Sequence, residues 1–156
     1  MRFVAQILTA NPILTLCVLS WVVAQILKVI IQLVHFHKLE LRYLLSSGGM
    51  PSSHSSVVCT CAVSVGLLTG WDSVAFALAV ILALVVMYDA ANVRREAGKQ
   101  AKIINYIMEN KREMRPDFYG KALKELLGHT PMQVLAGAVL GVIVALVGMN
   151  FFAGSA

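Results

Sequence analysis

The sequence predicts an all-α fold: a polytopic membrane helix bundle with about four transmembrane helices and one cytoplasmic helical loop. The first observation behind this prediction is composition, because 58% of the 156 residues are hydrophobic, only 13% are charged, and the mean hydropathy is +0.77. An ordinary soluble domain carries about twice that share of charged residues. The second observation is that long apolar runs alternate with short polar or turn-forming stretches. We therefore expect a single integral membrane domain over residues 1–156.

The expected spans lie at about residues 12–34, 53–68, 74–93 and 131–149. The first apolar run is too long for a secretory signal peptide, and no small-residue cleavage site follows it. Trp71 lies in a tight turn between the second and third spans, at the depth of an interfacial aromatic residue. Residues 94–130 form the one long water-facing segment, and we expect its first part to be helical.

The distribution of basic residues predicts the orientation of these spans. The loops 35–52 and 94–130 lie on the same side of the membrane and hold 11 of the 13 lysines and arginines. That side should therefore be cytoplasmic, with both termini outside. Because the basic residues follow the membrane topology and no basic stretch is interleaved with stacking aromatics, the formal charge of +5 does not indicate a nucleic-acid partner.

Residues 48–56 bring turn residues, hydroxyl groups and a histidine together just before the second apolar run. The two glycines allow close approach of the backbone, and Pro51 is preset for the first helical position. The free N–H groups of this helix start, with the hydroxyls of Ser52 and Ser53, would hold a phosphate while His54 exchanges a proton. The alternative is a well-capped helix with a histidine on the surface.

Further polar residues are expected at the same membrane face. Lys28 lies inside the first span, where a cation is costly unless it faces a partner or a polar cavity; the alternative is a lysine that snorkels to the interface. Asp89 is followed by Arg94 and Arg95 near the membrane boundary, a group that binds an anion or forms an ion pair. His129 precedes the last span on this side as well. We expect these groups to converge on one cytoplasmic site.

The remaining small residues predict packing. Gly137 and Gly141 form a GxxxG pair in the last span, typical of a tight helix contact either within one chain or between two copies in a homodimer. The three cysteines all lie in apolar segments without the spacing of a zinc site or a disulfide framework. We therefore expect no metal and no cofactor.

Three stretches together resemble a known group of proteins: Gly48-Gly49-Met50-Pro51-Ser52-Ser53-His54, Tyr88-Asp89-Ala90 followed by Val93-Arg94-Arg95, and Leu127-Gly128-His129-Thr130-Pro131. Over nearly its whole length the chain is similar to the type 2 phosphatidic acid phosphatase and vanadium haloperoxidase superfamily. It resembles most closely that superfamily's small divergent branch of bacterial and plastid membrane proteins, described as acid phosphatase/vanadium-dependent haloperoxidase-related. The resemblance implies a bacterial inner membrane protein.

The resemblance also implies roles for individual residues. Ser53 and His54 match the motif that supplies a serine and an acid histidine, and His129 with Pro131 matches the motif of the nucleophilic histidine. Lys28 matches the phosphate-binding lysine of the first motif.

The chain departs from the superfamily pattern at three positions. His35 stands where the first motif has an arginine, and Leu123 where the third motif has one. Gln133 stands in place of the carboxylate behind the nucleophile, so it can orient the imidazole but cannot stabilise its positive charge. The missing cation would come from one of three nearby basic residues: Arg94, Arg95 or Lys124.

These residues lead to two hypotheses of different classes. The first is a metal-independent phosphatase acting on a membrane-associated phosphate or pyrophosphate ester, such as a lipid phosphate, through a phosphohistidine on His129, with His54 protonating the leaving oxygen. Phosphate would be held by Lys28, Ser52, Ser53, Arg94 and Arg95, with Asp89 beside them. The alternative is a catalytically inactive membrane protein that binds a phosphorylated ligand or assembles with partners, which Gln133 and the absent arginine favour. A solute pathway is disfavoured, because four spans without repeats hardly enclose one.

Overall fold

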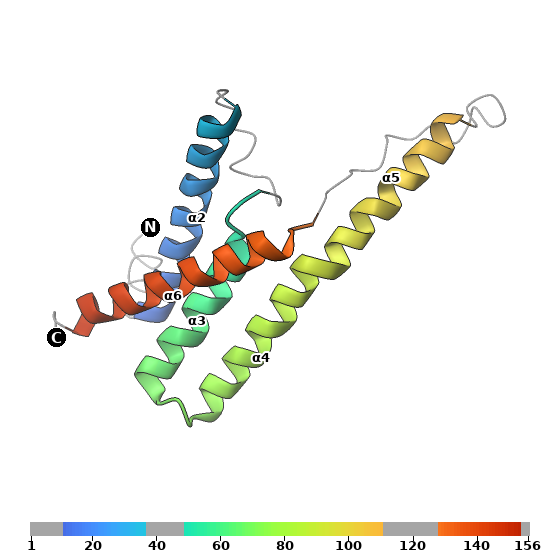
Figure 1. Ribbon diagram of the computed structural model, residues 1–156. Coiled ribbons are helices and arrows are strands. Elements are labelled where there is room, and N and C mark those ends of the chain that lie inside the picture. The colour runs from blue at the N-terminus through green and yellow to red at the C-terminus, as the bar shows by residue number, and fades with distance from the viewer. Residues whose placement is uncertain (1–10, 37–48, 111–127, 154–156) are drawn as a thin grey trace, which may run out of the picture.

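The computed structural model describes residues 11–36, 49–110 and 128–153, which are almost entirely helical (Figure 1). Helix α2 (Pro12–Phe36) is followed by α3 (Ser53–Thr69) and α4 (Val74–Tyr88). Helix α4 continues through a π-helical segment, η2 (Asp89–Val93), into α5 (Arg94–Asn110), and the last helix is α6 (Pro131–Ala153). Helix α3 lies at the centre, in contact with α2, α4 and α6. The prediction of an all-α membrane fold is confirmed.

Local sequence explains where these helices begin. The side chain of Asn11 accepts a hydrogen bond from the N–H of Leu14 at the start of α2. Ser52 and Ser73 cap α3 and α4 in the same way, each accepting from the N–H three residues later. Pro51 therefore lies one residue before the cap of α3 rather than at its first helical position, which corrects the sequence expectation.

Three helical segments are long and apolar enough to cross a membrane: Pro12–Val34, Val74–Glu109 and Pro131–Phe152. They contain the first, third and fourth expected spans, although the helix of the third continues without a break past residue 93. The second expected span forms α3, an apolar helix of 17 residues. Its length is about 25 Å at 1.5 Å per residue, shorter than the ~30 Å hydrocarbon core. The part of the expected cytoplasmic loop at residues 111–127 lies outside the described residues.

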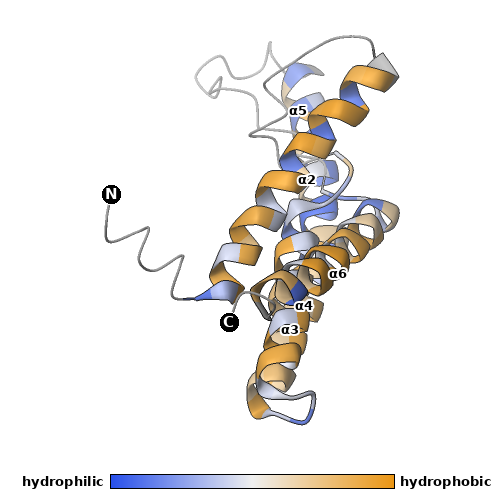
Figure 2. Cartoon of the chain, turned by 90° about the vertical axis from the view of Figure 1, so that its left-hand side faces the viewer, coloured by the Kyte–Doolittle hydropathy of each residue, from blue (hydrophilic) through white to orange (hydrophobic). Residues whose placement is uncertain are grey.

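Helix α3 is short but well enclosed, and its polar side chains face its neighbours. A stripe of hydroxyl groups along α3 is fully or almost fully buried, as expected for helix packing: Ser53, Ser56, Thr60 and Ser64. The hydroxyl of Thr60 lies within hydrogen-bond distance of the Ser20 hydroxyl on α2 and of the Gly141 carbonyl on α6. In contrast, the outer faces of the long helices carry exposed Leu, Ile and Val side chains, and Figure 2 shows α2 and α6 hydrophobic over most of their length. The polar groups thus lie inside the bundle and the apolar ones face the bilayer.

The GxxxG pair is used within the chain. A Cβ atom at Gly137 would meet the backbone of Ser52, and one at Gly141 would meet the backbone of Ser56. Both glycines therefore let α6 approach α3 closely. Of the two alternatives for this pair, the contact inside one chain is the one that the structure contains, and the surface expected to join two copies in a homodimer is already occupied by α3.

Candidate functional site

The start of α3 is held at the mouth of the bundle by backbone contacts to α6. The N–H of Ser52 donates to the carbonyl of Gln133 at 3.0 Å, while its hydroxyl accepts from the N–H of Ser55. Ser52 is completely buried. It therefore serves as the cap and anchor of α3, and in this structure its side chain is committed to Ser55.

Lys28 reaches this helix start from α2. Its side chain is buried, with only 3% of the residue exposed, and Nζ lies 3.4 Å from the hydroxyl of Ser53. Gly49 lies against the aliphatic part of the same lysine, with φ = 93° that favours glycine. Lys28 thus turns into the protein instead of snorkelling to the interface, and it brings a positive charge to the start of α3.

His129 lies at the start of α6 and is 99% buried. Its N–H donates to the carbonyl of Ala90 in η2 at 3.0 Å. The preceding residue, Gly128, packs directly on the backbone of Arg94 and Arg95, where a Cβ atom would clash. The glycine before the histidine is therefore required for the close approach between the start of α6 and the start of α5.

The protonation of the His129 ring follows from its neighbours. The side-chain oxygen of Gln133 accepts from the N–H of Thr130 at 3.1 Å, so the atom at this position is the oxygen and not the nitrogen of the amide. The same oxygen lies 3.3 Å from Nδ1 of His129. Because an amide oxygen can only accept, Nδ1 carries the proton and Nε2 keeps its lone pair. Nε2 is buried and has no hydrogen-bond partner among the described residues.

The environment also disfavours a positive charge on His129. Burial is the main cause that lowers its pKa, and the charge of Lys28 acts in the same direction, as does that of His54 when it is protonated. The hydrogen bond to Gln133 opposes this shift, and so does the nearby backbone of Gly49. At neutral pH the ring is therefore a neutral base with an available Nε2 lone pair.

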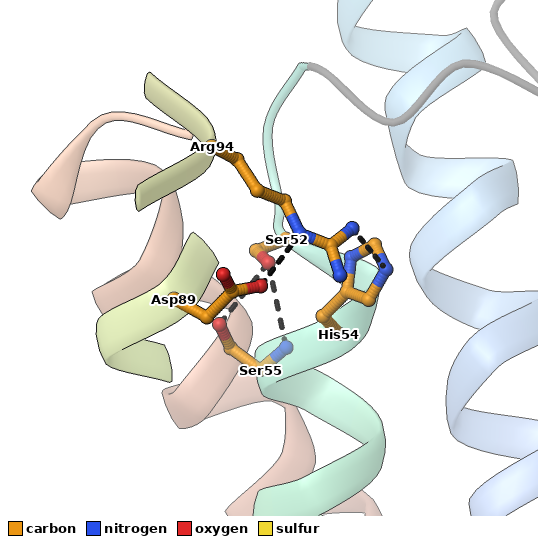
Figure 3. A network of polar contacts seen from close by, with 5 residues as sticks. All are labelled: Ser52, His54, Ser55, Asp89 and Arg94. Carbon is orange, nitrogen blue, oxygen red and sulfur yellow. Dashed lines mark hydrogen bonds and ion pairs between the residues drawn. The ribbon is translucent and has the colours of Figure 1, made fainter. Parts of the chain in front are cut away.

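His54 lies beside His129 in the first turn of α3. The two ring centroids are 6.0 Å apart with the planes inclined at 63°. Nε2 of His54 lies 3.4 Å from Nη1 of Arg94, and Arg94 Nε donates to the Asp89 carboxylate at 2.6 Å (Figure 3). The Asp89–Arg94 ion pair, expected as one of two alternatives, is thus present.

The π-helix explains why Asp89 and Arg94 meet. Side chains five residues apart on an α-helix point about 140° away from each other. In η2, however, the N–H of Arg94 bonds to the carbonyl of Asp89, and this i→i+5 repeat brings the two residues to the same side. The side chain of Arg95 is exposed and makes no hydrogen bond or ion pair with any described residue.

The comparisons with known proteins show the family of this chain. A model of the divergent PAP2 family matches residues 9–144. The chain belongs to this family. It is also 39% identical over 157 residues to the "Uncharacterized membrane protein YuiD" of Bacillus subtilis (strain 168), covering 94% of this chain and 99% of that protein. No solved structure matches the chain.

The residues matched by the divergent PAP2 model, 9–144, include all the site residues described above. The structure brings together most of the predicted site residues: Lys28, Ser53, His54, Asp89, Arg94, His129 and Gln133. Ser52 supports the cluster as a cap, Arg95 contributes backbone, and Lys124 and Leu123 lie outside the described residues. Sequence reasoning missed Thr130, whose N–H fixes the Gln133 amide, and Ala90, whose carbonyl anchors His129. No cluster of three or more His, Cys, Asp and Glu side chains within the described ranges is arranged to hold a metal ion.

Proposed function

We propose that this protein is a metal-independent phosphatase that acts on a membrane-associated phosphate or pyrophosphate ester. The observation that carries the proposal is the state of His129: a buried, neutral imidazole with Nδ1–H held by Gln133 and Nε2 without a partner among the described residues. An imidazole nitrogen in this state is a nucleophile, and a cationic environment beside it suits a phosphoryl group. Membership of the divergent PAP2 family supports the same class of reaction.

In the first step, Nε2 of His129 attacks phosphorus, an N–P bond forms, and the P–O bond to the leaving group breaks. His54 donates a proton to the departing oxygen. A water molecule then attacks the phosphohistidine, the N–P bond breaks, and inorganic phosphate is released. The proposal places the phosphoryl oxygens between Lys28, Ser53 and Arg94, because these groups surround the two rings and can each donate a hydrogen bond.

The depth of the cluster favours a substrate anchored in the bilayer. Lys28 lies eight residues before the end of α2 at Phe36, about 12 Å along the helix axis. A phosphate at Lys28 and Ser53 would therefore lie below the end of the helix, at a depth that suits a substrate held in the bilayer. We propose that the site faces the cytoplasm of a bacterial inner membrane with both termini outside, as the distribution of Lys and Arg favours.

The second candidate function is a phosphate-binding membrane protein without turnover, and Gln133 is the observation that favours it. Once His129 has attacked, its ring is positive, and a neutral amide offers little compensation. In a serine protease triad the analogous loss of the carboxylate costs on the order of 10⁴ in rate. A chain with this arrangement could therefore bind a phosphate ester without hydrolysing it.

A phosphate-release screen of the purified protein distinguishes the two candidates. Substrates should include lipid phosphates, isoprenyl phosphates, pyrophosphates and soluble esters, with His129→Ala as the control. Release by the natural protein and not by His129→Ala supports the phosphatase. No release, together with phosphate binding that weakens in Lys28→Ala, supports the binding protein.

A further inference from the structure

Arg94 has two partners in the free protein, and they use different atoms. Its Nε donates to Asp89 at 2.6 Å, whereas Nη1 faces Nε2 of His54 at 3.4 Å (Figure 3). A guanidinium group has only donors, so the His54 nitrogen that it faces must be the acceptor. His54 is therefore neutral in this arrangement, with its proton on Nδ1, and Nε2 cannot act as an acid.

The other ring nitrogen of His54, Nδ1, gains no hydrogen bond with the described residues that would stabilise this neutral form. It is buried and has no hydrogen-bond partner among the described residues. The ring is thus held in its present state by Arg94 on one side, while its other nitrogen is unsatisfied. A buried polar atom without a partner is costly, so this arrangement of the His54 ring is not strongly stabilised.

The contact of Arg94 to His54 is the one of its two that is easily exchanged. The bond of Nε to Asp89 is short and charge-assisted, whereas about half of the Arg94 side chain is exposed, so an anion from the solvent can reach its Nη groups. The contact to His54 is long for a hydrogen bond. A tetrahedral dianion offers the guanidinium charged acceptors at shorter range, and Arg is well suited to bind them.

We propose that Arg94 exchanges His54 for the phosphate: Nε stays on Asp89 as a pivot, Nη1 turns away from His54, and both Nη groups contact the bound anion. His54 Nε2, freed from a cation and facing the anion, then takes up a proton from the solvent. Anion binding and protonation of the acid histidine thereby favour each other. The inference rests on the proposed phosphate site, but it does not require that the substrate be hydrolysed.

The groups that face His54 come from four parts of the structure: Lys28 on α2, Asp89 in η2, Arg94 at the start of α5 and His129 before α6. Lys28 is held at Ser53, and His129 by Gln133. Of the two cations that face His54, Lys28 is buried and Arg94 is exposed. It is therefore the group whose movement changes the surroundings of His54 with the least disturbance of the core.

The test measures proton uptake when sulfate binds to the purified full-length protein in detergent. Sulfate is a tetrahedral dianion whose charge is constant at the pH values used, so any net proton uptake belongs to the protein. Calorimetric titrations in two buffers with different protonation enthalpies give that uptake directly. We expect net uptake approaching about one proton per sulfate near neutral pH.

Arg94→Ala should bind sulfate about 10- to 100-fold more weakly and lose the proton uptake. Lys99→Ala is the matched control, because Lys99 is an exposed cation on the same helix that forms its ion pair with Glu96 and not with a residue of the site. This variant should behave like the natural protein. Should Arg94→Ala not fold, Arg94→Lys serves instead, since a single ammonium group cannot keep the Asp89 pivot while exchanging His54 for the anion.

The role of Asp89 as the pivot of Arg94 is tested by combining substitutions of the two residues. In an Asp89→Ala background, adding Arg94→Ala should no longer change the proton uptake, and Asp89→Asn should partly restore the coupling. Three results would overturn the proposal: no sulfate binding, binding without proton uptake by the natural protein, or uptake that persists in Arg94→Ala and so belongs to another group. Coupling without phosphatase activity would refute the proposed hydrolysis alone, whereas activity without coupling would refute this inference alone.

Discussion

Replacing Gln133 by Glu should raise the turnover of the proposed phosphatase, and the structure sets the size of the gain. The oxygen of Gln133 already lies 3.3 Å from His129 Nδ1 and is fixed by the N–H of Thr130. The required tautomer is therefore present, and the substitution adds only negative charge. Charge-assisted hydrogen bonds contribute about 1 to 1.5 kcal/mol more than neutral ones, which corresponds to about tenfold in kcat. This is far below the ~10⁴ of a protease triad, where the amide leaves the histidine in the wrong tautomer.

The assay compares kcat and KM separately, because a carboxylate near the phosphate can also weaken substrate binding. His129→Ala and the double variant with Gln133→Glu are the controls, and both should be inactive. The pH profile gives a second readout: a carboxylate beside His129 raises its pKa, so the acid limb of kcat should move to higher pH.

Loss of activity in a correctly folded Gln133→Glu protein would refute this reasoning, and Asp89 would become the next candidate for the orienting group. Inactivity of both proteins, with sulfate binding that depends on Lys28, would instead support the binding protein.

Four further predictions concern the fold and its orientation. Burial lowers the pKa of His129, so the unfolded chain binds this proton more readily; the free energy of unfolding should fall as pH drops below about 6.5, and His129→Gln should flatten that dependence in thermal unfolding. Gly128→Ala should destabilise the protein by about 1–3 kcal/mol in the same assay, because its Cβ would meet the backbone at the start of α5. Gly137→Leu should reduce the folded fraction on a detergent sizing column without changing the oligomeric state of what remains folded, whereas clean dissociation of a dimer would contradict the internal contact. In intact cells a cysteine introduced near Lys111 should be shielded from an impermeant thiol reagent and one near Ala156 should react; the opposite labelling would reverse the orientation.

Hydropathy alone was sufficient to predict the positions of the long helices, because a bilayer imposes both length and composition on a spanning segment. It also placed the start of α3, the Asp89 region and His129 on one side, and the structure brings these three regions together. The bounds of α3 were predicted to within one residue, but the expectation that it spans the membrane was the weaker part of the prediction. Three hydroxyls of its polar stripe, those of Ser53, Ser56 and Thr60, contact neighbouring helices, so the sequence pattern alone does not distinguish a spanning helix from a shorter enclosed one.

Other features of the site depend on relations that the sequence pattern does not contain. Regular α-helical spacing places neither Arg94 nor Arg95 on the face of Asp89, so the choice between them followed only from the π-helix. The tautomer of His129 depended on Thr130, whose role is a backbone N–H and leaves no trace in residue type. The GxxxG pair indicated a close contact correctly, but the partner of that contact is a tertiary property.

The π-helical segment η2 has a consequence for the helix that follows it. An i→i+5 turn contains one residue more than an α-helical turn, so removing a single residue from 89–93 would restore the ordinary repeat. Arg94 would then lie four residues after Asp89, and residues four apart on an α-helix point only about 40° away from each other. The guanidinium of Arg94 would therefore stay on the side of Asp89, because the π-helical turn absorbs the one extra residue between them. The position of this cation is thus encoded by helical phase as well as by residue type, and a deletion of one alanine, Ala91, should keep Arg94 beside Asp89 although the π-helical turn is lost.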